Sequence, residues 1–277
     1  MARRIVVGVD GSVPSMAAVE WAASDARIRG LPLRIVHVCG PWPHSPGGLA
    51  YCTKALEAAA TWARDLGAEV TTETLTGNVI GDLIGESARA DSVVLGSRGL
   101  GGFSGMVLGS VGLAVAGHAA GPVVIVRGPA EAAHARVVVG YDGSEHSRAA
   151  MEYALEQARA RGAELHVVYG WRMPMFSPYA AVAGSLLEDA FQQEVKAARE
   201  RVAPWREDNP DIKITDAEVC EHPVAALIEA SRTADLVVVG SRGLGPFASA
   251  MLGSVSHGVL HHVTCPVAVV RPQEDQR

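Results

Sequence analysis

Several features that would assign a function at once are scarce or missing from this sequence of 277 residues. Aromatic residues make up only 5% of it, and no apolar run approaches the roughly 20 residues that a membrane-spanning helix needs. No block of Lys and Arg occurs, and the net charge of −6 argues against sequence-independent binding to nucleic acid. The basic start reaches Asp10 through a short β-branched run, which is typical of a strand and not of a signal peptide. We therefore expect a cytoplasmic protein with no membrane or nucleic-acid partner.

Cysteine is also scarce. The chain has four cysteines, and they show no CxxC or other metal-binding spacing: Cys39, Cys52, Cys220 and Cys265. None of them recurs at the matching position of the internal repeat described below. Such a set is typical of reduced thiols in a cytosolic protein and gives no sign of a disulfide framework.

Two common phosphate-binding motifs are missing as well. No Gly-Lys pair occurs anywhere in the sequence, so the chain has no Walker A loop. The dinucleotide pattern GxGxxG also fails, because Ser104 stands where a third glycine should follow Gly99 and Gly101. Any nucleotide site in this protein must therefore be built in another way.

What the sequence does contain is an internal repeat, which is the first feature to seek in a chain of this length. The segment RIVVGVDGS at 4–12 returns as RVVVGYDGS at 136–144, an offset of 132. Farther along, VLGSRGLG at 94–101 returns as VVGSRGLG at 238–245, an offset of 144. The second copy therefore carries 12 extra residues (144 − 132) between these two segments.

The repeat divides the chain into two domains, which we place at 1–128 and 135–271. Each copy is long enough to bury its own core, and a short polar, Ala-rich linker at 128–134 joins them. The extra residues of copy two are expected within 173–187, a segment rich in Pro, Ala and Ser.

Apolar patterning predicts five strands that alternate with four helices in copy one. Residues 4–9 form a β-branched run, as expected of a strand that is buried on both faces. Further strands are predicted at 33–38, 69–74, 92–95 and 123–126, and helices at about 12–29, 53–66, 79–88 and 110–119. Ser12 is placed to cap the first helix, and Gly30 is the expected stop signal at its end. This alternation indicates an α/β fold, with a parallel sheet covered by helices on both faces.

The chemistry is expected in the glycine-rich loop after the fourth strand. In copy one Gly96 and Gly99 are followed by nine residues and then by the pair Gly109-Ser110, and copy two repeats this spacing from Gly240 to Ser254. Glycine lets the backbone approach a ligand closely, and a helix N-terminus offers free N–H groups and a positive dipole end to an anion. The alternative is that these glycines only form tight turns, with Ser110 and Ser254 as plain N-caps. The preserved spacing favours a polyphosphate site.

Two further pairs of shared residues leave alternatives open. Asp10 and Asp142 end the first strand of each copy, where an Asp can serve as a ligand group or as a turn and capping residue. Arg98 and Arg242 lie within the glycine loops, where they can contact phosphate or remain exposed.

Together these motifs resemble the ATP-binding subclass of the universal stress protein family, which is marked by G-x2-G-x9-G-[ST]. Both copies match this motif without a gap, and the resemblance covers residues 3–127 and 135–271. It implies two tandem α/β domains of the adenine nucleotide alpha hydrolase-like type, each with an open five-stranded parallel sheet ordered 3-2-1-4-5. That order would bring Asp10 and Gly96 to the topological switch point, where open α/β sheets bind their ligands.

The resemblance also implies the residues that hold the nucleotide. Gly8 and Asp10 would lie beside adenine and ribose, and Val38 would contact adenine. The ribose and phosphates would be held by the loop residues Gly96, Ser97, Arg98, Gly99, Leu100, Gly101, Gly102, Gly109, Ser110 and Val111. The counterparts in copy two are Gly140, Asp142, Gly240, Ser241, Arg242, Gly243, Leu244, Gly245, Gly253, Ser254 and Val255. Copy two departs at one position, since Val38 aligns with Gly170, so its adenine pocket should be built differently.

No residue is assigned a catalytic or metal-binding role. His257 and His261 are four apart on a predicted helix, a spacing that could hold a metal, but copy one has Leu113 and Gly117 there. Because the pair also lacks a third ligand, we expect a surface or packing role for it. No HExxH motif, nucleophile elbow or recurrent Ser/His/Asp set is present.

Three functions of different classes remain. The leading hypothesis is a nucleotide-binding regulator of a stress response, in which ATP with Mg²⁺ biases a conformation or an assembly. The alternative is a slow ATPase or nucleotidyl-transfer enzyme, which would need a general base or a metal carboxylate shared by both copies. A third is a purely structural pseudo-dimer whose sites are inactive.

The last strand of each copy suggests how the copies associate. Residues 123–126 and 267–270 are apolar and carry none of the charges that usually protect an exposed sheet edge. We expect these two strands to pair in antiparallel fashion within one chain, since the linker raises their effective concentration. Pairing between separate chains, as a homodimer, is the alternative.

Overall fold

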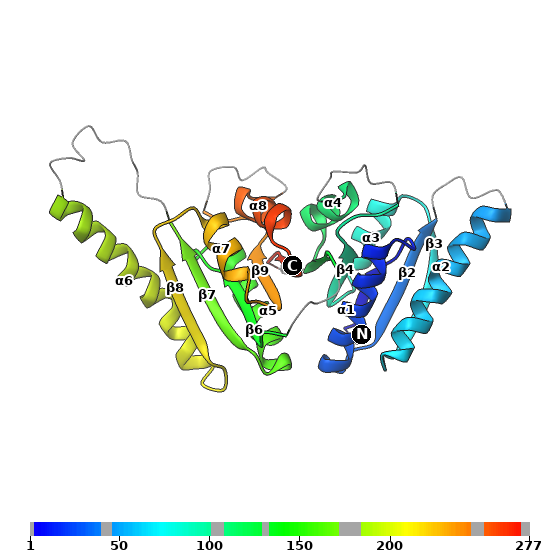
Figure 1. Ribbon diagram of the computed structural model, residues 1–277, viewed down its shortest axis with the longest axis horizontal. Coiled ribbons are helices and arrows are strands. Elements are labelled where there is room, and N and C mark those ends of the chain that lie inside the picture. Colours follow the sequence, from blue (N-terminus) through cyan, green and yellow to red (C-terminus); the bar gives the residue numbers. More distant parts are fainter. Residues whose placement is uncertain are drawn as a thin grey trace, which may run out of the picture.

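The computed structural model describes residues 3–39, 46–100, 108–128, 133–171, 184–244 and 252–272. Strands and helices alternate along the described chain (Figure 1). The strands are β1 (Ile5–Gly8), β2 (Leu33–Cys39), β3 (Val70–Thr76), β4 (Ser92–Gly96), β5 (Val123–Val126), β6 (Arg136–Gly140), β7 (Glu164–Gly170), β8 (Ile214–Val219), β9 (Leu236–Gly240) and β10 (Val267–Val270). The helices are α1 (Val13–Arg29), α2 (Pro46–Asp65), α3 (Val79–Ser87), α4 (Ser110–His118), α5 (Glu145–Arg161), α6 (Gly184–Asp208), α7 (Pro223–Ser231) and α8 (Ser254–His262).

All ten strands belong to one mixed sheet, in the order β3-β2-β1-β4-β5-β10-β9-β6-β7-β8. Within each half the strands are parallel and follow the order 3-2-1-4-5 that the resemblance implied. The halves meet where β5 and β10 pair in antiparallel register, with Ile125 opposite Val267 and Val123 opposite Val269. The predicted pairing within one chain is therefore confirmed. The expectation of two separate open sheets is corrected, because the pairing of β5 with β10 joins the two halves into a single mixed sheet.

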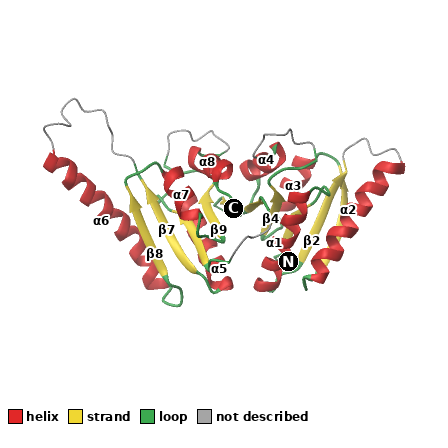
Figure 2. Ribbon diagram, in the orientation of Figure 1, coloured by secondary structure: helices red, strands yellow, loops and turns green. Residues whose placement is uncertain are grey.

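Helices cover both faces of this sheet (Figure 2). One core lies between the sheet and α1, α2, α5 and α6, and the other lies beneath α3, α4, α7 and α8. Since the strands are buried on both faces, successive residues serve opposite cores: Val6 packs in one and Val7 in the other. No described helix has the length and apolar character that crossing a bilayer requires.

The first helix of each copy begins and ends at the predicted signals. The Ser12 side chain caps α1 by accepting a hydrogen bond from the Ser15 N–H at 3.3 Å, and the helix ends at Gly30 with φ of 62°. In copy two α5 is capped by Ser144 and ends at Gly162 with φ of 61°. A glycine is favoured at such a helix end because other residues reach the left-handed region at a cost.

Two arginines cross between the halves in a reciprocal way. Arg127, which follows β5, donates a hydrogen bond to the Leu260 carbonyl of α8. Arg271, which follows β10, donates one to the Gly117 carbonyl of α4. The acceptors differ by one position in the repeat, since Leu260 corresponds to Ala116, so the two contacts are similar but not identical. They connect each half to the helix of the other half near the middle of Figure 1.

A buried carboxylate lies between α1 and α5. Asp25 is fully buried and accepts hydrogen bonds from Arg161 at 2.6 Å and from Arg29 at 3.3 Å. The repeat offset of 132 places Gln157 at the position of Asp25 and Arg161 at the position of Arg29. The neutral Gln157, whose Nε2 lies 3.4 Å from Asp25, avoids a second buried carboxylate beside the first.

The expectation of four reduced thiols is wrong for two of them. Cys39 and Cys52 form a disulfide, whereas Cys220 and Cys265 are free. The pairing was not visible in the sequence because it depends on the packing of α2 against β2, which brings the two Cα atoms to 6.6 Å. Helix α2 begins at Pro46, earlier than the predicted residue 53, so Cys52 lies within the helix.

Two predicted connections lie mainly outside the described residues. Residues 129–132 of the linker and 172–183 of the extra segment are not described, while 184–187 open α6.

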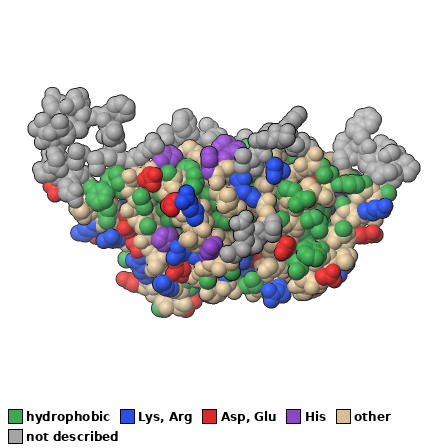
Figure 3. Space-filling model, in the orientation of Figure 1, with side chains coloured by type: hydrophobic (Ala, Val, Ile, Leu, Met, Phe, Trp, Pro, Cys, Tyr) green, Lys and Arg blue, Asp and Glu red, His purple; other side chains and the backbone are tan. Residues whose placement is uncertain are grey.

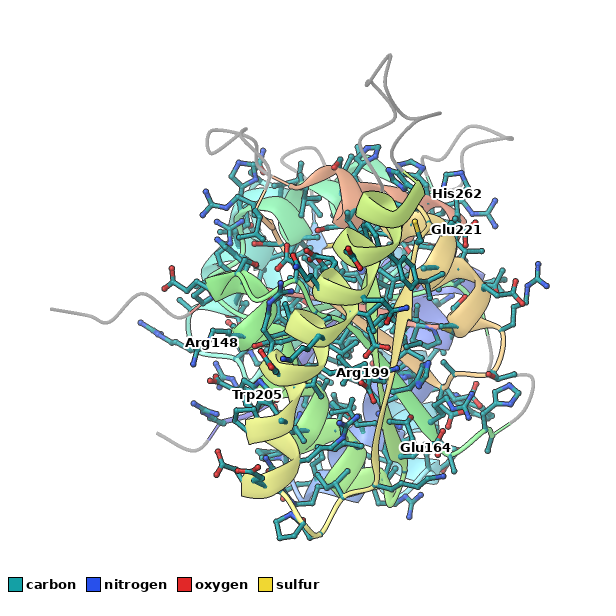
Figure 4. The ribbon with its side chains drawn as sticks, turned by 90° about the vertical axis from the view of Figure 1, so that its left-hand side faces the viewer. Arg148, Glu164, Arg199, Trp205, Glu221 and His262 are labelled. Atoms are coloured by element: carbon teal, nitrogen blue, oxygen red, sulfur yellow. A yellow bond between two sulfur atoms is a disulfide. The ribbon has the colours of Figure 1, made fainter. Side chains whose placement is uncertain are left out.

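Figure 4 shows α6 lying across β8, with Arg199 and Trp205 on this helix. Arg199 pairs with Glu218 of β8 at 3.3 Å, and Trp205 donates a hydrogen bond to the Tyr141 hydroxyl at 3.2 Å.

The shared edge can be tested with charged substitutions. We expect Val124→Lys with Ile125→Glu to lower the free energy of unfolding of the whole chain by more than about 4 kcal/mol, because the two charges would be buried on opposite faces of β5. Denaturant unfolding combined with size-exclusion chromatography measures this.

The same charges on β3, as Thr72→Lys with Thr74→Glu, are the control, since both threonines are exposed and should tolerate them. If the β5 variant instead turns a dimer into stable, well-folded monomers, the pairing within one chain is wrong.

Candidate functional site

Two cavities open at the carboxyl ends of the strands, one in each half, where β1 meets β4 and β6 meets β9. Their volumes are about 420 Å³ in copy one and about 900 Å³ in copy two, within the range of small-molecule sites. The predicted residues that line the first are Gly8, Asp10, Val38, Gly96, Arg98, Gly99, Leu100, Gly109, Ser110 and Val111. Those that line the second are Gly140, Asp142, Gly240, Arg242, Gly243, Leu244, Gly253, Ser254 and Val255.

A few of the predicted residues are not brought to the cavities. Ser97 and Ser241 are buried at 2% and 0% exposure and line neither cavity. The Ser241 hydroxyl instead forms a hydrogen bond with His146 Nδ1 at 2.9 Å. The predictions for Gly101, Gly102 and Gly245 fall outside the described residues.

The backbone of Ser97 holds the two ends of the copy-one glycine loop together. The Ser97 N–H donates to the Val126 carbonyl at 2.7 Å, and the Ser97 carbonyl accepts from the Gly109 N–H at 2.7 Å. In copy two Ser241 has the same backbone role toward Gly253, at 2.8 Å. The nine-residue loop is thus closed at its base, and the start of the following helix is fixed beside the end of the fourth strand.

The aspartates anchor the glycine loop to the first helix. The Asp10 carboxylate accepts the Ser12 N–H at 3.0 Å and the Leu100 N–H at 2.8 Å. Asp142 repeats this with Ser144 at 2.9 Å and Leu244 at 3.1 Å. The turn-stabilising role, one of the two considered for these residues, is therefore present in both copies.

The electrostatics of the two aspartates follow from these bonds. Burial alone would raise the pKa of Asp10, but hydrogen bonds from Ser12, Leu100 and Ser15 outweigh it and lower the pKa below its usual value. The pKa of Asp142 is lowered for the same reasons. Both groups are therefore carboxylates at neutral pH, with each oxygen occupied by a backbone donor.

The helices that follow the glycine loops begin differently from the others with a described N-cap. Four helices start with a side chain that accepts a backbone N–H: Ser12 for α1, Asn78 for α3, Ser144 for α5 and His222 for α7. Helices α4 and α8 start at Gly109 and Gly253, which have no side-chain cap. Ser110 and Ser254 are thus the first helical residues and not N-caps. In the part of the chain that the structure describes, no side chain caps the first N–H groups of α4 and α8, which are the kind of donors that bind an anion.

The positions of the motif require glycine for different structural reasons. A Cβ on Gly96 would lie 2.6 Å from the backbone carbonyl carbon of Pro14, and one on Gly240 would lie 2.8 Å from that of His146. Close packing against the first helix therefore requires glycine there. A Cβ on Gly109 would meet Arg98 Cα at 3.5 Å, an ordinary contact, so packing against the described residues does not account for this glycine.

The two cavities differ at the position of Val38. Its counterpart Gly170 lies against the start of α7, where a Cβ would be 2.7 Å from Pro223 Cα. The copy-two cavity therefore has no side chain at this point, in line with the different pocket expected from the sequence. In copy one Tyr51 of α2 also enters the cavity and donates a hydrogen bond to the Asp10 carbonyl at 2.9 Å.

Several lining residues were missed by the sequence analysis. They include Ser15, His37, Tyr51 and Leu83 in copy one and His146, Tyr169, Leu227 and His257 in copy two. Leu83 and Leu227 are counterparts in the repeat, and Ser15 corresponds to Ser147, which also lines its cavity, whereas the histidines have no histidine counterpart. The position of His37 beside Val38 is the one local hint in the sequence.

The histidine pair of α8 has no third ligand among the described residues. The rings of His257 and His261 stack with centroids 4.5 Å apart, and neither belongs to a described cluster of three or more donors. His257 does reach the copy-two cavity. In Figure 3 the visible histidine side chains lie over copy two and the middle of the molecule.

The fold and the paired cavities define a tandem α/β protein with one cavity at the topological switch point of each half. Two regions, 1–127 and 134–271, match the sequence profile of the universal stress protein family. A universal stress protein of Mycobacterium tuberculosis is 38% identical over 309 residues, which cover 98% of this chain and 96% of that protein. The chain belongs to the universal stress protein family.

Solved structures agree with this fold. A universal stress protein from Archaeoglobus fulgidus superposes with a TM-score of 0.73 and 22% identity, covering 99% of this chain and all of that one. Universal stress protein structures that match 34% and 46% of the chain, with TM-scores of 0.31 and 0.39, were solved with dAMP and cAMP respectively.

Substitution by alanine separates the packing glycines from the others. We expect Gly96→Ala to lower the free energy of unfolding by about 1–3 kcal/mol, because its Cβ meets rigid backbone of α1. Gly109→Ala should cost about 1 kcal/mol or less, since its Cβ fits. Equal losses for both variants in denaturant unfolding would contradict the geometry described for the loop.

Proposed function

We propose that each half of the chain binds one ATP and that the protein is a cytoplasmic, nucleotide-dependent regulator of a stress response. The observation that carries this proposal is the pair of uncapped helix N-termini, at α4 and α8, each opening into a cavity beside a glycine turn. Membership in the universal stress protein family supports it, since both copies match the motif of the family's ATP-binding subclass.

The composition of the copy-one cavity fits an adenine nucleotide. Its inner wall is apolar, with Val36, Val38 and Leu83, and suits a flat base. Its other end carries Arg98 and the start of α4 at Gly109, which suit phosphates. A ligand with an apolar base at one end and a polyphosphate at the other matches this polarity.

Gly109, which packing against the described residues does not require, supports the same assignment. Because a Cβ would fit at Gly109 among the described residues, its absence leaves space on the cavity side for a phosphate to approach the backbone. In copy two Gly253 holds the same place, but a Cβ there would lie only 3.2 Å from Arg242 Cα, so packing also favours glycine at that position.

We expect Mg²⁺ to bind as a complex with the nucleotide and not at a separate protein site. The Asp10 and Asp142 oxygens already accept backbone N–H groups, so these carboxylates do not form a ready-made metal site. Mg²⁺ is commonly held by phosphate oxygens and water, and its charge would neutralise the triphosphate.

The same hydrogen bonds support regulation over rapid catalysis. A general base must have a pKa near the working pH, and the aspartates shared by the two sites have lowered values. Copy two has His146 at its cavity, but copy one has Pro14 at the equivalent position. The histidine at the copy-one cavity, His37, lies on β2 and has Tyr169 as its counterpart, so the two sites share no general base.

Binding stoichiometry tests the proposal. Calorimetry with Mg·ATP should give about two ATP per chain. Gly109→Asp should remove one of these sites, because the new carboxylate repels the phosphates and fills their space. Gly253→Asp should remove the other.

The two single variants are matched controls for each other, and circular dichroism should show that both keep their fold. A Gly109→Asp chain that still binds two ATP, or a wild type that gives no binding heat, would contradict the assignment.

Turnover distinguishes a regulator from an enzyme. We expect phosphate release far slower than about 10 s⁻¹, the typical turnover of an enzyme, so that nucleotide survives purification and can be identified by mass after heat denaturation. Rapid turnover that is lost in a His146→Ala variant would place the protein among the ATPases instead.

A further inference from the structure

A cluster of three metal-binding side chains lies at the end of β2 and the start of α2. His37 and Cys39 are two residues apart on the strand and so point to the same face, toward α2, which provides Cys52. All three side chains are buried, and their donor atoms lie within 4.8 Å of one another. Among the described residues, no other group of three or more His, Cys, Asp or Glu side chains has its donor atoms this close together.

The disulfide accounts for the two sulfur atoms but not for the histidine. His37 is 6% exposed, and its Nδ1 has no hydrogen-bond partner among the described residues. Most buried polar atoms have a hydrogen-bond partner, so an unpartnered nitrogen beside two sulfur atoms calls for an explanation. The ring also has a hydrogen bond with the backbone of Val9, and we assign it to Nε2 because Nδ1 has no partner. A metal-bound imidazole is typically held in this way, through its other nitrogen.

We propose that this cluster is a zinc site when Cys39 and Cys52 are reduced, with His37 Nδ1 and the two thiolates as ligands. Sulfur and imidazole donors suit Zn²⁺, and three protein ligands leave the fourth tetrahedral position to water or to another small ligand. Two thiolates balance the two positive charges of the ion, so the occupied site is neutral in its buried position.

The site exchanges with the disulfide by a balanced reaction. A dithiol reductant transfers two electrons and two protons to the disulfide and becomes a disulfide itself, which leaves two thiols on the chain. Binding of Zn²⁺ then releases these two protons as the thiols become thiolates. The oxidised chain cannot bind the ion in this way.

Copy two provides a comparison within the same molecule. Tyr169 and Trp171 occupy the positions of His37 and Cys39, and the Tyr169 hydroxyl donates a hydrogen bond to Glu194. This half has no thiolate at the equivalent point. The proposal therefore predicts one metal ion per chain and not two.

The zinc site is separate from the nucleotide-binding proposal but adjacent to it. His37 lines the copy-one cavity, as does Tyr51, the neighbour of Cys52 on α2. A metal ion bound here would fix the first turns of α2 beside this cavity without requiring that any nucleotide bind.

Cobalt titration of the reduced full-length chain tests the site, with Co²⁺ alone as the probe and no nucleotide added. We expect one equivalent of Co²⁺ to bind with a thiolate-to-cobalt charge-transfer band, and Zn²⁺ to displace it. His37→Gln should weaken binding by more than about 100-fold, since even the loss of an outer partner of a metal site costs roughly 10- to 100-fold. The double variant Cys220→Ser, Cys265→Ser is the control and should bind normally.

Alkylation provides a readout that needs no variant. Zn²⁺ should protect Cys39 and Cys52, but not the exposed Cys220, from alkylation in the reduced wild type, as measured by peptide mass spectrometry. The proposal is overturned if reduced wild type shows no charge-transfer band, if His37→Gln binds like wild type, or if Zn²⁺ leaves Cys39 and Cys52 unprotected.

Discussion

The antiparallel ladder between β5 and β10 is the contact on which the rest of the structure depends. These strands have four residues each and are buried on both faces, so neither half would be covered at this edge without the other. An exposed apolar edge of this kind favours association with other chains, and pairing within the chain removes it. The duplication thereby turns two open sheets into one sheet whose remaining edges are β3 and β8.

The pseudo-two-fold axis at this ladder also explains departures from exact repetition. Residues near the axis face their own counterparts, so a charge that is acceptable once would be duplicated. Asp25 and Gln157 illustrate this, since two carboxylates at these positions would have to share the same arginines. Farther from the axis the halves diverge freely: copy one acquires Tyr51 and the His37 cluster, and copy two has a larger cavity with His146.

Within each half one carboxylate connects the scaffold to the site. Asp10 joins the start of α1 to the glycine loop through two backbone N–H groups, and Asp142 does the same in copy two. Of the two roles that the sequence left open for these aspartates, these contacts show the turn-stabilising one. This use of both carboxylate oxygens leaves neither aspartate as an unpartnered acid at its cavity.

The sequence by itself determined the elements and the places where ligands are expected. Strand and helix periodicity, the Ser12 cap, the Gly30 stop and the repeated glycine loop are local features, and their physical basis lies within a few residues of chain. Tertiary structure decided which side chains meet. It buried Ser97 away from the cavity, placed Tyr51 within it, and brought Cys39 to Cys52 and His37. The contacts of Tyr51 and of the two cysteines depend on how α2 packs against β2. Sequence periodicity and spacing do not reveal this packing, because it joins residues through space and not along the chain.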